Sequence, residues 1–177
     1  EDALAGIAHV VVPGRLQRID EGQDYLAIVD YAHKPAAVAA VIATLRSEIK
    51  GRLCVVLGAG GDRDASKRAI MGREAARGSD LFIVTDDNPR SEDPAVIRAA
   101  VEAGAYELPT EERGEVRNIG DRAAAIRAAI AWAEPGDAVL VAGKGHETGQ
   151  NVNGVIHHFD DREEVRAALQ ERRTGSL

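Results

Sequence analysis

The sequence predicts an α/β domain built on a mostly parallel sheet. Strand-like and helix-like runs alternate along most of the 177 residues, as they do in βαβ units. Three strand-like runs, 53–57, 81–85 and 138–142, are continuous and apolar, as strands covered on both faces are. A polar loop that contains glycine or proline follows each of the three. In open α/β sheets, such loops at the carboxyl ends of the strands form the ligand site.

The elements follow in a regular order. Strands are expected over residues 25–30, 53–57, 81–85, 115–119 and 138–142. Helices are expected over 65–77, 94–104 and 121–133, with two more that begin at 35 and 161. Their apolar residues recur at i, i+3, i+4 and i+7, which indicates one face packed on the sheet. In the helix that begins at Pro35 this stripe consists of Val38, Val41, Ile42 and Leu45.

Capping residues mark where these helices begin and end. Pro35 is a favoured first helical residue. Asp64 is the expected N-cap of the next helix, and Gly78 its stop. Asp93 is the expected cap of the third helix, which Gly104 ends.

The last third of the chain adds a hairpin and a final helix. Residues 151–159 read as a hairpin whose tight turn is Asn153-Gly154. Asp161 and Glu164 have capping-box spacing, so Asp161 is the expected N-cap of the final helix. Residues 105–115 are polar and are expected to form a surface loop or short insertion.

Composition and charge exclude several classes of function. A net charge of −7 and a pI near 5.3 argue against a nucleic-acid partner, which needs a basic face. No apolar run approaches the roughly 20 residues of a membrane span, and no signal peptide is visible. We therefore expect a cytoplasmic protein with no membrane partner. The single cysteine, Cys54, lies within an apolar strand and is expected to be a buried core residue.

The first 14 residues fit the alternating pattern poorly. Residues 7–12 are strand-like, and Pro13-Gly14 then turns the chain. The sequence begins at Glu1 without a methionine. We expect residues 1–14 to be the end of a preceding domain with its linker, and residues 15–177 to be the domain itself.

The loop after residue 57 reads Gly58-Ala-Gly-Gly-Asp-Arg-Asp64 and precedes a helix. Backbone N–H groups and a helix N-terminus attract anions, and Arg63 adds a guanidinium suited to a carboxylate or phosphate. The spacing matches neither the dinucleotide fingerprint nor a phosphate-binding loop. A tight turn with surface charges is the alternative interpretation.

Two further loops carry complementary groups. In Asp87-Asn88-Pro89-Arg90 the proline would stiffen the loop and aim Asn88 and Arg90 into the crevice. The alternative is a plain helix-entry turn. In residues 143–147, Glu147 would suit an ammonium group, although the loop could also serve chain reversal alone. His146 beside Glu147 is a weak metal signal without a third ligand nearby.

Together, Arg63, Arg90 and Glu147 would complement a zwitterion with an additional carboxylate, which favours an amino acid over a nucleotide. The first strand ends in Asp30-Tyr-Ala-His-Lys-Pro35. Asp30 could bind a ribose hydroxyl or cap the following helix. His33 is as well suited to a structural role as to a functional one.

Five motifs in order make the chain resemble the Mur ligases of peptidoglycan synthesis. They are Pro13-Gly-Arg15, Asp30-Tyr-Ala-His-Lys-Pro35, Gly58-Ala-Gly-Gly-Asp-Arg-Asp64, Asp87-Asn-Pro-Arg90 and Gly143-Lys-Gly-His-Glu147. The resemblance covers nearly the whole chain and is strongest to members that add meso-diaminopimelate to UDP-MurNAc-L-Ala-D-Glu. It implies a Rossmann-like α/β/α C-terminal domain with a sheet of about six strands, one of them antiparallel.

The resemblance also implies residue roles. Arg63, Asp87, Asn88, Pro89, Arg90, Gly143 and Glu147 match positions at the diaminopimelate site. Arg15, Asp30 and, more weakly, His33 match positions that reach ATP when the domains close. The family's ATP loop, Mg²⁺ ligands and catalytic lysine belong to a central domain, so no catalytic or metal-binding residue is expected here. The isolated chain is therefore expected to form no ADP.

Two other functions stay open at this point. Another Mur ligase or a folylpolyglutamate synthetase shares the implied architecture and would take a different amino acid. A non-enzymatic α/β module that binds an amino acid is the second alternative, and the missing ATP loop supports it. The Asn-Pro-Arg run and the Gly-His-Glu loop favour the diaminopimelate-adding ligase over both.

Overall fold

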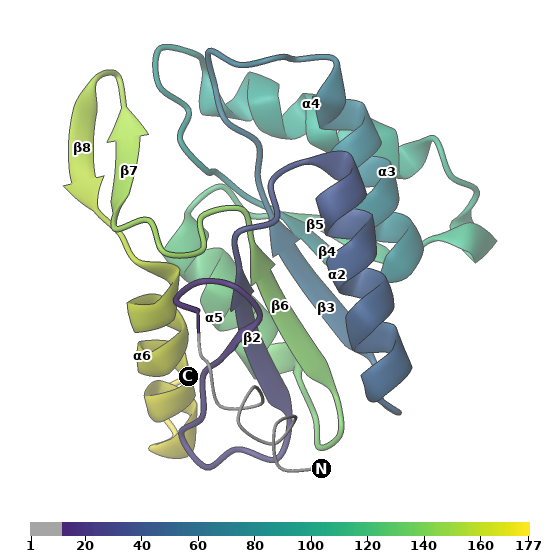
Figure 1. The fold of residues 1–177 in the computed structure, drawn as a ribbon, viewed down its shortest axis with the longest axis vertical. Helices are drawn as coiled ribbons and strands as arrows, with labels where there is room; N and C mark the ends of the chain where they lie inside the picture. The colour runs from purple at the N-terminus through teal and green to yellow at the C-terminus, as the bar shows by residue number, and fades with distance from the viewer. Residues whose placement is uncertain (1–11) are drawn as a thin grey trace, which may run out of the picture.

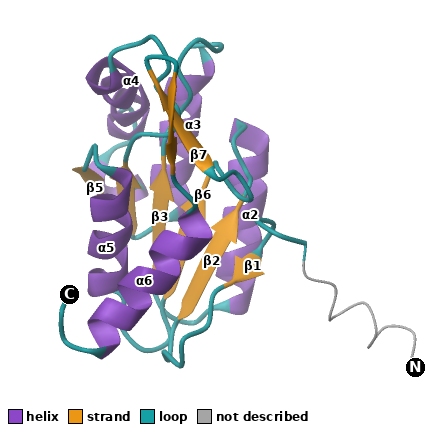
Figure 2. Ribbon diagram, turned by 90° about the vertical axis from the view of Figure 1, so that its left-hand side faces the viewer, coloured by secondary structure: helices purple, strands orange, loops and turns teal. Residues whose placement is uncertain are grey.

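The computed structural model describes residues 12–177 and is organised around a mixed sheet. The strand order is β1-β2-β6-β3-β4-β5, and all neighbours are parallel except β1 and β2 (Figure 1; β1 is labelled in Figure 2). The strands are β1 Gln17–Arg18, β2 Leu26–Asp30, β3 Leu53–Leu57, β4 Leu81–Val84, β5 Glu115–Asn118 and β6 Ala138–Ala142. The predicted fold class is therefore confirmed, including the single antiparallel neighbour.

Helices cover both faces of this sheet (Figure 2). They are α2 Pro35–Glu48, α3 Lys67–Gly78, α4 Pro94–Tyr106, α5 Arg122–Trp132 and α6 Asp161–Arg173. The first three pack in one apolar cluster with alternate strand residues such as Val55 and Phe82. Helices α5 and α6 pack on the other face with the intervening residues, such as Cys54 and Ile83. This alternation explains why the central strands are apolar throughout.

The remaining elements are a short turn of 3₁₀-helix, Thr110–Glu112, and a hairpin of β7 Gly149–Val152 with β8 Val155–His158. The hairpin projects from the body above α6 (Figure 1). Its turn residues Asn153 and Gly154 have φ of 52° and 80°, the left-handed values that a two-residue turn requires. The predicted hairpin and turn are confirmed. No described helix is long and apolar enough to cross a membrane.

Three predicted helix signals are wrong. The N-cap of α3 is Ser66, because Asp64 instead accepts hydrogen bonds from the Ser66 amide and hydroxyl in the turn before the helix. Helix α6 is capped by Asp160, which places Asp161 in the first turn. Gly104 does not end α4, which continues to Tyr106.

Gly104 has a packing role. A Cβ there would lie 1.8 Å from the Ala69 carbonyl oxygen, and one at Gly72 would lie 1.8 Å from the Val101 carbonyl oxygen. The two glycines therefore allow the backbones of α3 and α4 to approach closely. Gly78 is the last residue of α3 as expected, and a Cβ there would collide with Ile42 of α2.

The sequence pattern does not reveal β1, because two polar residues carry no periodic signal. Residues 7–11 of the strand-like N-terminal run lie outside the described residues. Strands β3 and β6 are neighbours, yet the helices that follow them along the chain, α3 and α6, lie on opposite faces. Such a reversal opens a crevice at the carboxyl ends of the two strands, where ligands bind in open α/β sheets.

Candidate functional site

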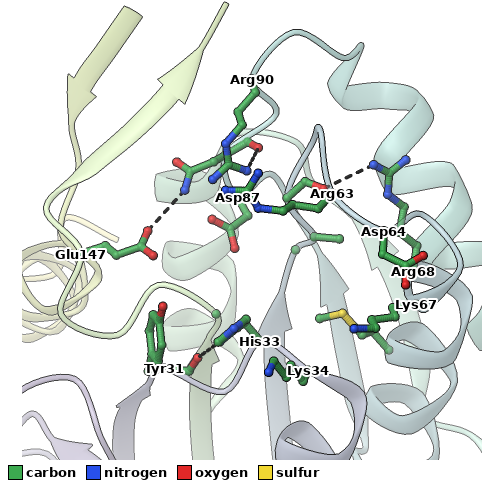
Figure 3. A pocket seen from close by; sticks show the side chains of 16 residues that line it. Tyr31, His33, Lys34, Arg63, Asp64, Lys67, Arg68, Asp87, Arg90 and Glu147 are labelled. Carbon is green, nitrogen blue, oxygen red and sulfur yellow. Dashed lines mark hydrogen bonds between the residues drawn. The ribbon is translucent and has the colours of Figure 1, made fainter. Parts of the chain in front are cut away.

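A pocket of about 370 Å³ lies at the carboxyl ends of the strands, at this reversal (Figure 3). The loops after β2, β3, β4 and β6 line it. Of the seven residues predicted at the amino-acid site, six line the pocket: Arg63, Asp87, Asn88, Arg90, Gly143 and Glu147. The seventh, Pro89, is not among the lining residues. The pocket volume lies within the range typical of small-molecule sites.

The loops after β3 and β4 interlock through their backbones. The Gly61 amide donates to the Asn88 carbonyl oxygen at 2.8 Å, and the Arg90 guanidinium donates to the Gly61 carbonyl oxygen at 2.9 Å. A Cβ on Gly61 would lie only 1.9 Å from the Pro89 carbonyl oxygen. Pro89 therefore contacts the loop after β3 through its backbone, and position 61 requires glycine because the two backbones touch.

The Glu92 carboxylate, in the loop after β4, links this loop to the one after β3. Glu92 accepts from the buried Arg68 guanidinium at 2.5 Å and from the Asp62 amide at 2.8 Å. These bonds lower the pKa of Glu92. Asp62, at φ 52°, accepts from the Ser91 hydroxyl at 2.6 Å, which lowers the pKa of Asp62. The sequence pattern does not reveal this contact, because Arg68 reads as part of a polar helix face.

The β7–β8 hairpin holds the backbone of Arg90. The Arg90 amide donates to the Asn151 carbonyl oxygen at 3.0 Å, and the Asn153 amide donates to the Arg90 carbonyl oxygen at 2.8 Å. Arg90 has φ of 52°, which is uncommon for a residue with a side chain. The hairpin contacts therefore hold Arg90 in a conformation that the isolated loop would rarely adopt.

Negative charge gathers on the opposite wall of the pocket. Glu147 lies on the hairpin side, across the cavity from Arg63 (Figure 3). The Asn88 amide nitrogen donates to Glu147 Oε2 at 3.3 Å. The ammonium of Lys144 lies 3.4 Å from the same oxygen and 3.5 Å from Asp87 Oδ1. Nothing in the sequence pattern singles out Lys144, because a lysine between two glycines in a polar loop looks exposed.

Gly143, directly after β6, lets the backbone pass close to the Asp87 carboxylate. It has φ of 113°, and a Cβ there would lie 3.1 Å from Asp87 Oδ2. Its amide donates to the Asp30 carbonyl oxygen at 3.1 Å, which links the ends of β6 and β2. Both the backbone angle and the narrow space favour glycine at this position.

The residues predicted to reach ATP gather in a second, more open hollow of about 420 Å³. Arg15 and Asp30 line it, and His33 lines both this hollow and the first pocket. The Asp30 carboxylate accepts from the Leu16 amide at 2.7 Å and the Ala32 amide at 2.8 Å. Asp30 therefore holds the N-terminal segment and does not cap α2, whose N-cap is Lys34.

Tyr31 lines both cavities, as His33 and Lys34 do. Its ring centre lies 4.6 Å from that of His33 and 5.2 Å from that of His146. The Arg15 guanidinium lies 5.3 Å from the same ring centre, a cation–π distance. The residues that line the first pocket thus include the exposed guanidinium of Arg63 and the half-buried guanidinium of Arg90, with carboxylates on the opposite wall, and the second hollow adds Arg15.

This arrangement suits a ligand that carries both carboxylate and ammonium groups. Lys34 and Lys67 add positive charge to the pocket lining, and Asp64 adds to the negative charge. Within residues 12–177, no group of three or more histidine, cysteine, aspartate or glutamate residues could hold a metal ion.

Comparison with known proteins places this geometry in a family. A "UDP-N-acetylmuramoyl-L-alanyl-D-glutamate--2,6-diaminopimelate ligase" from Corynebacterium glutamicum is 66% identical over 174 residues, which are 97% of this chain and 34% of that protein. A ligase of the same name from Streptomyces coelicolor is 56% identical over 171 residues, 96% of this chain and 34% of that protein. The chain spans about a third of the length of the curated relatives it matches.

Solved structures show the same fold. A structure titled with the same ligase name superimposes with a TM-score of 0.84 at 41% identity, covering 94% of this chain and 33% of that one. Folylpolyglutamate synthase from Mycobacterium tuberculosis has a TM-score of 0.55 at 23% identity, covering 98% of this chain and 35% of that one, which indicates a shared fold alone. The family model described as "Mur ligase, glutamate ligase domain" matches residues 14–145, more than half of the chain. The chain therefore belongs to the Mur ligase family and forms its C-terminal, glutamate ligase domain.

Proposed function

We propose that this chain is the amino-acid-binding C-terminal domain of an ATP-dependent amide ligase. The ligase joins meso-diaminopimelate to UDP-MurNAc-L-Ala-D-Glu in peptidoglycan precursor synthesis, in the cytoplasm. Relatives that are 56–69% identical over nearly the whole chain carry the name of this reaction. In this proposal residues 1–14 close the central domain and residues 15–177 form the C-terminal domain.

The observation that carries the proposal is the convergence of Arg63, Arg90 and Glu147 on one pocket. Diaminopimelate has two carboxylates and two amino groups. The Arg63 and Arg90 guanidinium groups bind carboxylates, because a planar fork of N–H donors matches two carboxylate oxygens. Glu147, together with Asp87, binds an ammonium group.

The pocket also separates the two ends of the substrate. Asn88, Arg90, Gly143 and Glu147 hold the end that does not react, and the amine at the other end attacks the activated carboxylate. The attack forms the amide and releases phosphate. The residues of this chain contribute by holding the diamino acid in one orientation, which lowers the entropy cost of the bimolecular step.

ATP supplies the activation of that carboxylate as an acyl phosphate. Arg15, Asp30 and His33 would contact ATP from the second hollow when the domains close. Tyr31 and His33 line both cavities, so they would lie between nucleotide and amino acid. The Mg²⁺ ligands and the catalytic groups would come from the domains upstream.

Substrate selectivity of the full-length ligase tests the proposal. ADP release is measured with UDP-MurNAc-L-Ala-D-Glu, ATP and either meso-diaminopimelate or L-lysine, which lacks the second carboxylate. We expect a strong preference for diaminopimelate in kcat/KM. Equal use of lysine, or use of glutamate with a folate acceptor, would instead support one of the related ligases.

A further inference from the structure

Lys144 occupies an unusual place for a lysine. Its side chain is fully buried, with 0% exposure, and it does not line the pocket. It lies between Gly143 at φ 113° and Gly145 at φ 55°, so the chain turns at both neighbours. The Glu147 amide donates to the Lys144 carbonyl oxygen at 2.9 Å and closes the turn. Lys144 thus lies directly behind the pocket wall and cannot reach a ligand itself.

The Lys144 ammonium contacts three residues that do line the pocket. It donates to Asn88 Oδ1 at 3.1 Å, and it lies 3.4 Å from Glu147 Oε2 and 3.5 Å from Asp87 Oδ1. The ammonium thus donates two hydrogen bonds, to Asn88 and Glu147, and forms an ion pair with Asp87. Burial of an unpaired charge is costly, so this set of partners is required for the lysine to remain in place.

One consequence concerns the orientation of the Asn88 amide. Asn88 Oδ1 accepts from Lys144 and also from the Asn151 amide at 2.9 Å. Both donors face the oxygen, so the amide nitrogen points the other way and donates to Glu147 Oε2 at 3.3 Å. Lys144 and the Asn151 amide therefore fix together which group Asn88 presents to the pocket, and without Lys144 the Asn151 amide would have to hold this orientation alone.

The second consequence concerns charge. Asp87 and Glu147 are two carboxylates near one ammonium, which leaves one negative charge uncompensated in this cluster. Arg122 is also close enough to interact with both carboxylates, but it is already paired with Asp161. A single ligand ammonium would make the cluster neutral. Without Lys144, the negative charges of Asp87 and Glu147 would repel each other with no cation between them.

We propose that Lys144 is a positioning residue for the diamino acid, which fixes Asn88 and Glu147 in the geometry that receives the substrate's non-reacting end. This inference rests on the proposed function and adds to it a buried group that acts only through its neighbours. It assigns the selectivity for the diamino acid to three connected residues, Lys144, Asn88 and Glu147.

The test uses the full-length ligase with Lys144→Met, which keeps much of the volume and removes the charge and its donors. We expect KM for meso-diaminopimelate to rise about tenfold, as coupled side chains of one network typically show. The kcat and the KM for ATP should stay within about twofold, because the altered wall holds only the end that does not react. The control is Lys50→Met, an exposed lysine between α2 and β3, which should change none of these constants.

A second variant and a double-mutant cycle keep the test decisive. Lys144→Gln retains a donor for Asn88 Oδ1 and should fold even where the methionine variant does not; it too should raise KM for diaminopimelate. In an Asn88→Ala background, Lys144→Met should add much less than it does alone, because its effect passes through Asn88. Wild-type KM in both Lys144 variants, an equal loss for every substrate, or full additivity would overturn the inference. A wild-type enzyme that does not prefer diaminopimelate would instead overturn the proposed function.

Discussion

Arg122 and Asp161 form a doubly hydrogen-bonded ion pair that is sealed from solvent beneath the pocket. Arg122 Nε lies 2.8 Å from Asp161 Oδ1, and Nη2 lies 2.7 Å from Oδ2. Both side chains have 0% exposure. Burial alone lowers the pKa of Arg122, but the Asp161 charge and hydrogen bonds outweigh it and raise that pKa.

The same guanidinium ties together two strand ends that carry the site. It donates to the Asp86 carbonyl oxygen, after β4, at 3.2 Å and to the Ala142 carbonyl oxygen, at the end of β6, at 2.9 Å. The residues that follow are Asp87 in one loop and Gly143 in the other. The buried pair therefore holds in place the backbone that precedes two residues of the pocket lining, Asp87 and Gly143.

The first prediction is that Asp161→Ala strongly destabilises the chain. It leaves the Arg122 charge buried and unpaired, which typically costs about 3–5 kcal/mol. The free energy of unfolding, measured in urea, is the readout. The control is Glu115→Ala, which breaks the exposed pair between Glu115 and Arg117 and should cost less than about 1 kcal/mol. A loss at Asp161 no larger than that of the control would contradict the prediction.

Asp161 also illustrates what the sequence can and cannot predict. Its spacing to Glu164 predicts an N-cap, and the helix does begin there, but Asp160 is the cap. Two adjacent aspartates satisfy the local pattern equally well. In the folded chain Asp160 accepts from the Arg162 amide, whereas Asp161 pairs with Arg122, which lies 39 residues away in the chain and which only the folded structure brings close. Local patterns place helices reliably but do not identify such distant partners.

In the candidate site, too, some residues can be predicted from the sequence and others cannot. Arg63, Asn88 and Arg90 can be predicted because they follow apolar strands in polar loops, and loops of that kind meet at one edge of a parallel sheet. Lys144 and the contact between Arg68 and Glu92 cannot be predicted in this way, since their roles depend on burial. Strand β1 also escapes prediction, because its pairing with β2 and not its own residues makes it a strand.

The second prediction concerns acid stability. Asp137 is buried directly before β6. Burial raises its pKa, but hydrogen bonds from the Arg52 side chain and from the Glu134 and Arg52 amides outweigh this and lower the pKa below its usual value. The unfolded chain then binds a proton more readily, so the carboxylate stabilises the fold fully above the unfolded pKa. That contribution is lost as pH falls through the lower folded pKa.

Asp137→Asn should therefore reduce the free energy of unfolding at about pH 7, and the gap to wild type should narrow below about pH 4. Urea titrations over this pH range measure the gap directly. Other carboxylates titrate in both proteins, so the difference isolates Asp137. A gap that is constant from neutral to acid pH would show that the charge of this residue is not responsible.

The third prediction separates backbone strain from loss of binding. Gly143 and Gly136 both have positive φ, at 113° and 86°. Alanine at either position should cost about 1–3 kcal/mol of stability, because a side chain is strained there. Gly143→Ala also places a Cβ 3.1 Å from Asp87 Oδ2, whereas a Cβ at Gly136 meets nothing within 4 Å. Only Gly143→Ala should raise KM for diaminopimelate, and equal kinetics in the two variants would contradict a role for Gly143 in the pocket.

The fourth prediction is that Arg90→Ala removes the preference for meso-diaminopimelate over L-lysine in the full-length ligase. Arg90 is the guanidinium on the loop that the hairpin and Gly61 hold in place. Its loss leaves the second carboxylate of diaminopimelate without its partner, whereas lysine has no such group. Truncation of one member of a buried charge pair typically costs about 2–5 kcal/mol, which is roughly 30-fold or more in kcat/KM.

The measurement is the ratio of kcat/KM for the two amino acids, because a ratio is insensitive to the fraction of enzyme that is folded. Arg90→Lys should retain only part of the preference, since an ammonium lacks the fork of donors that a carboxylate matches. Arg18→Ala is the control, because Arg18 is exposed and its pair with Asp20 spans 3.8 Å. If Arg90→Ala left the ratio as it is in wild type, the second carboxylate would have to bind another group. Arg63, whose guanidinium is exposed on the pocket wall, would then be the arginine that holds this carboxylate.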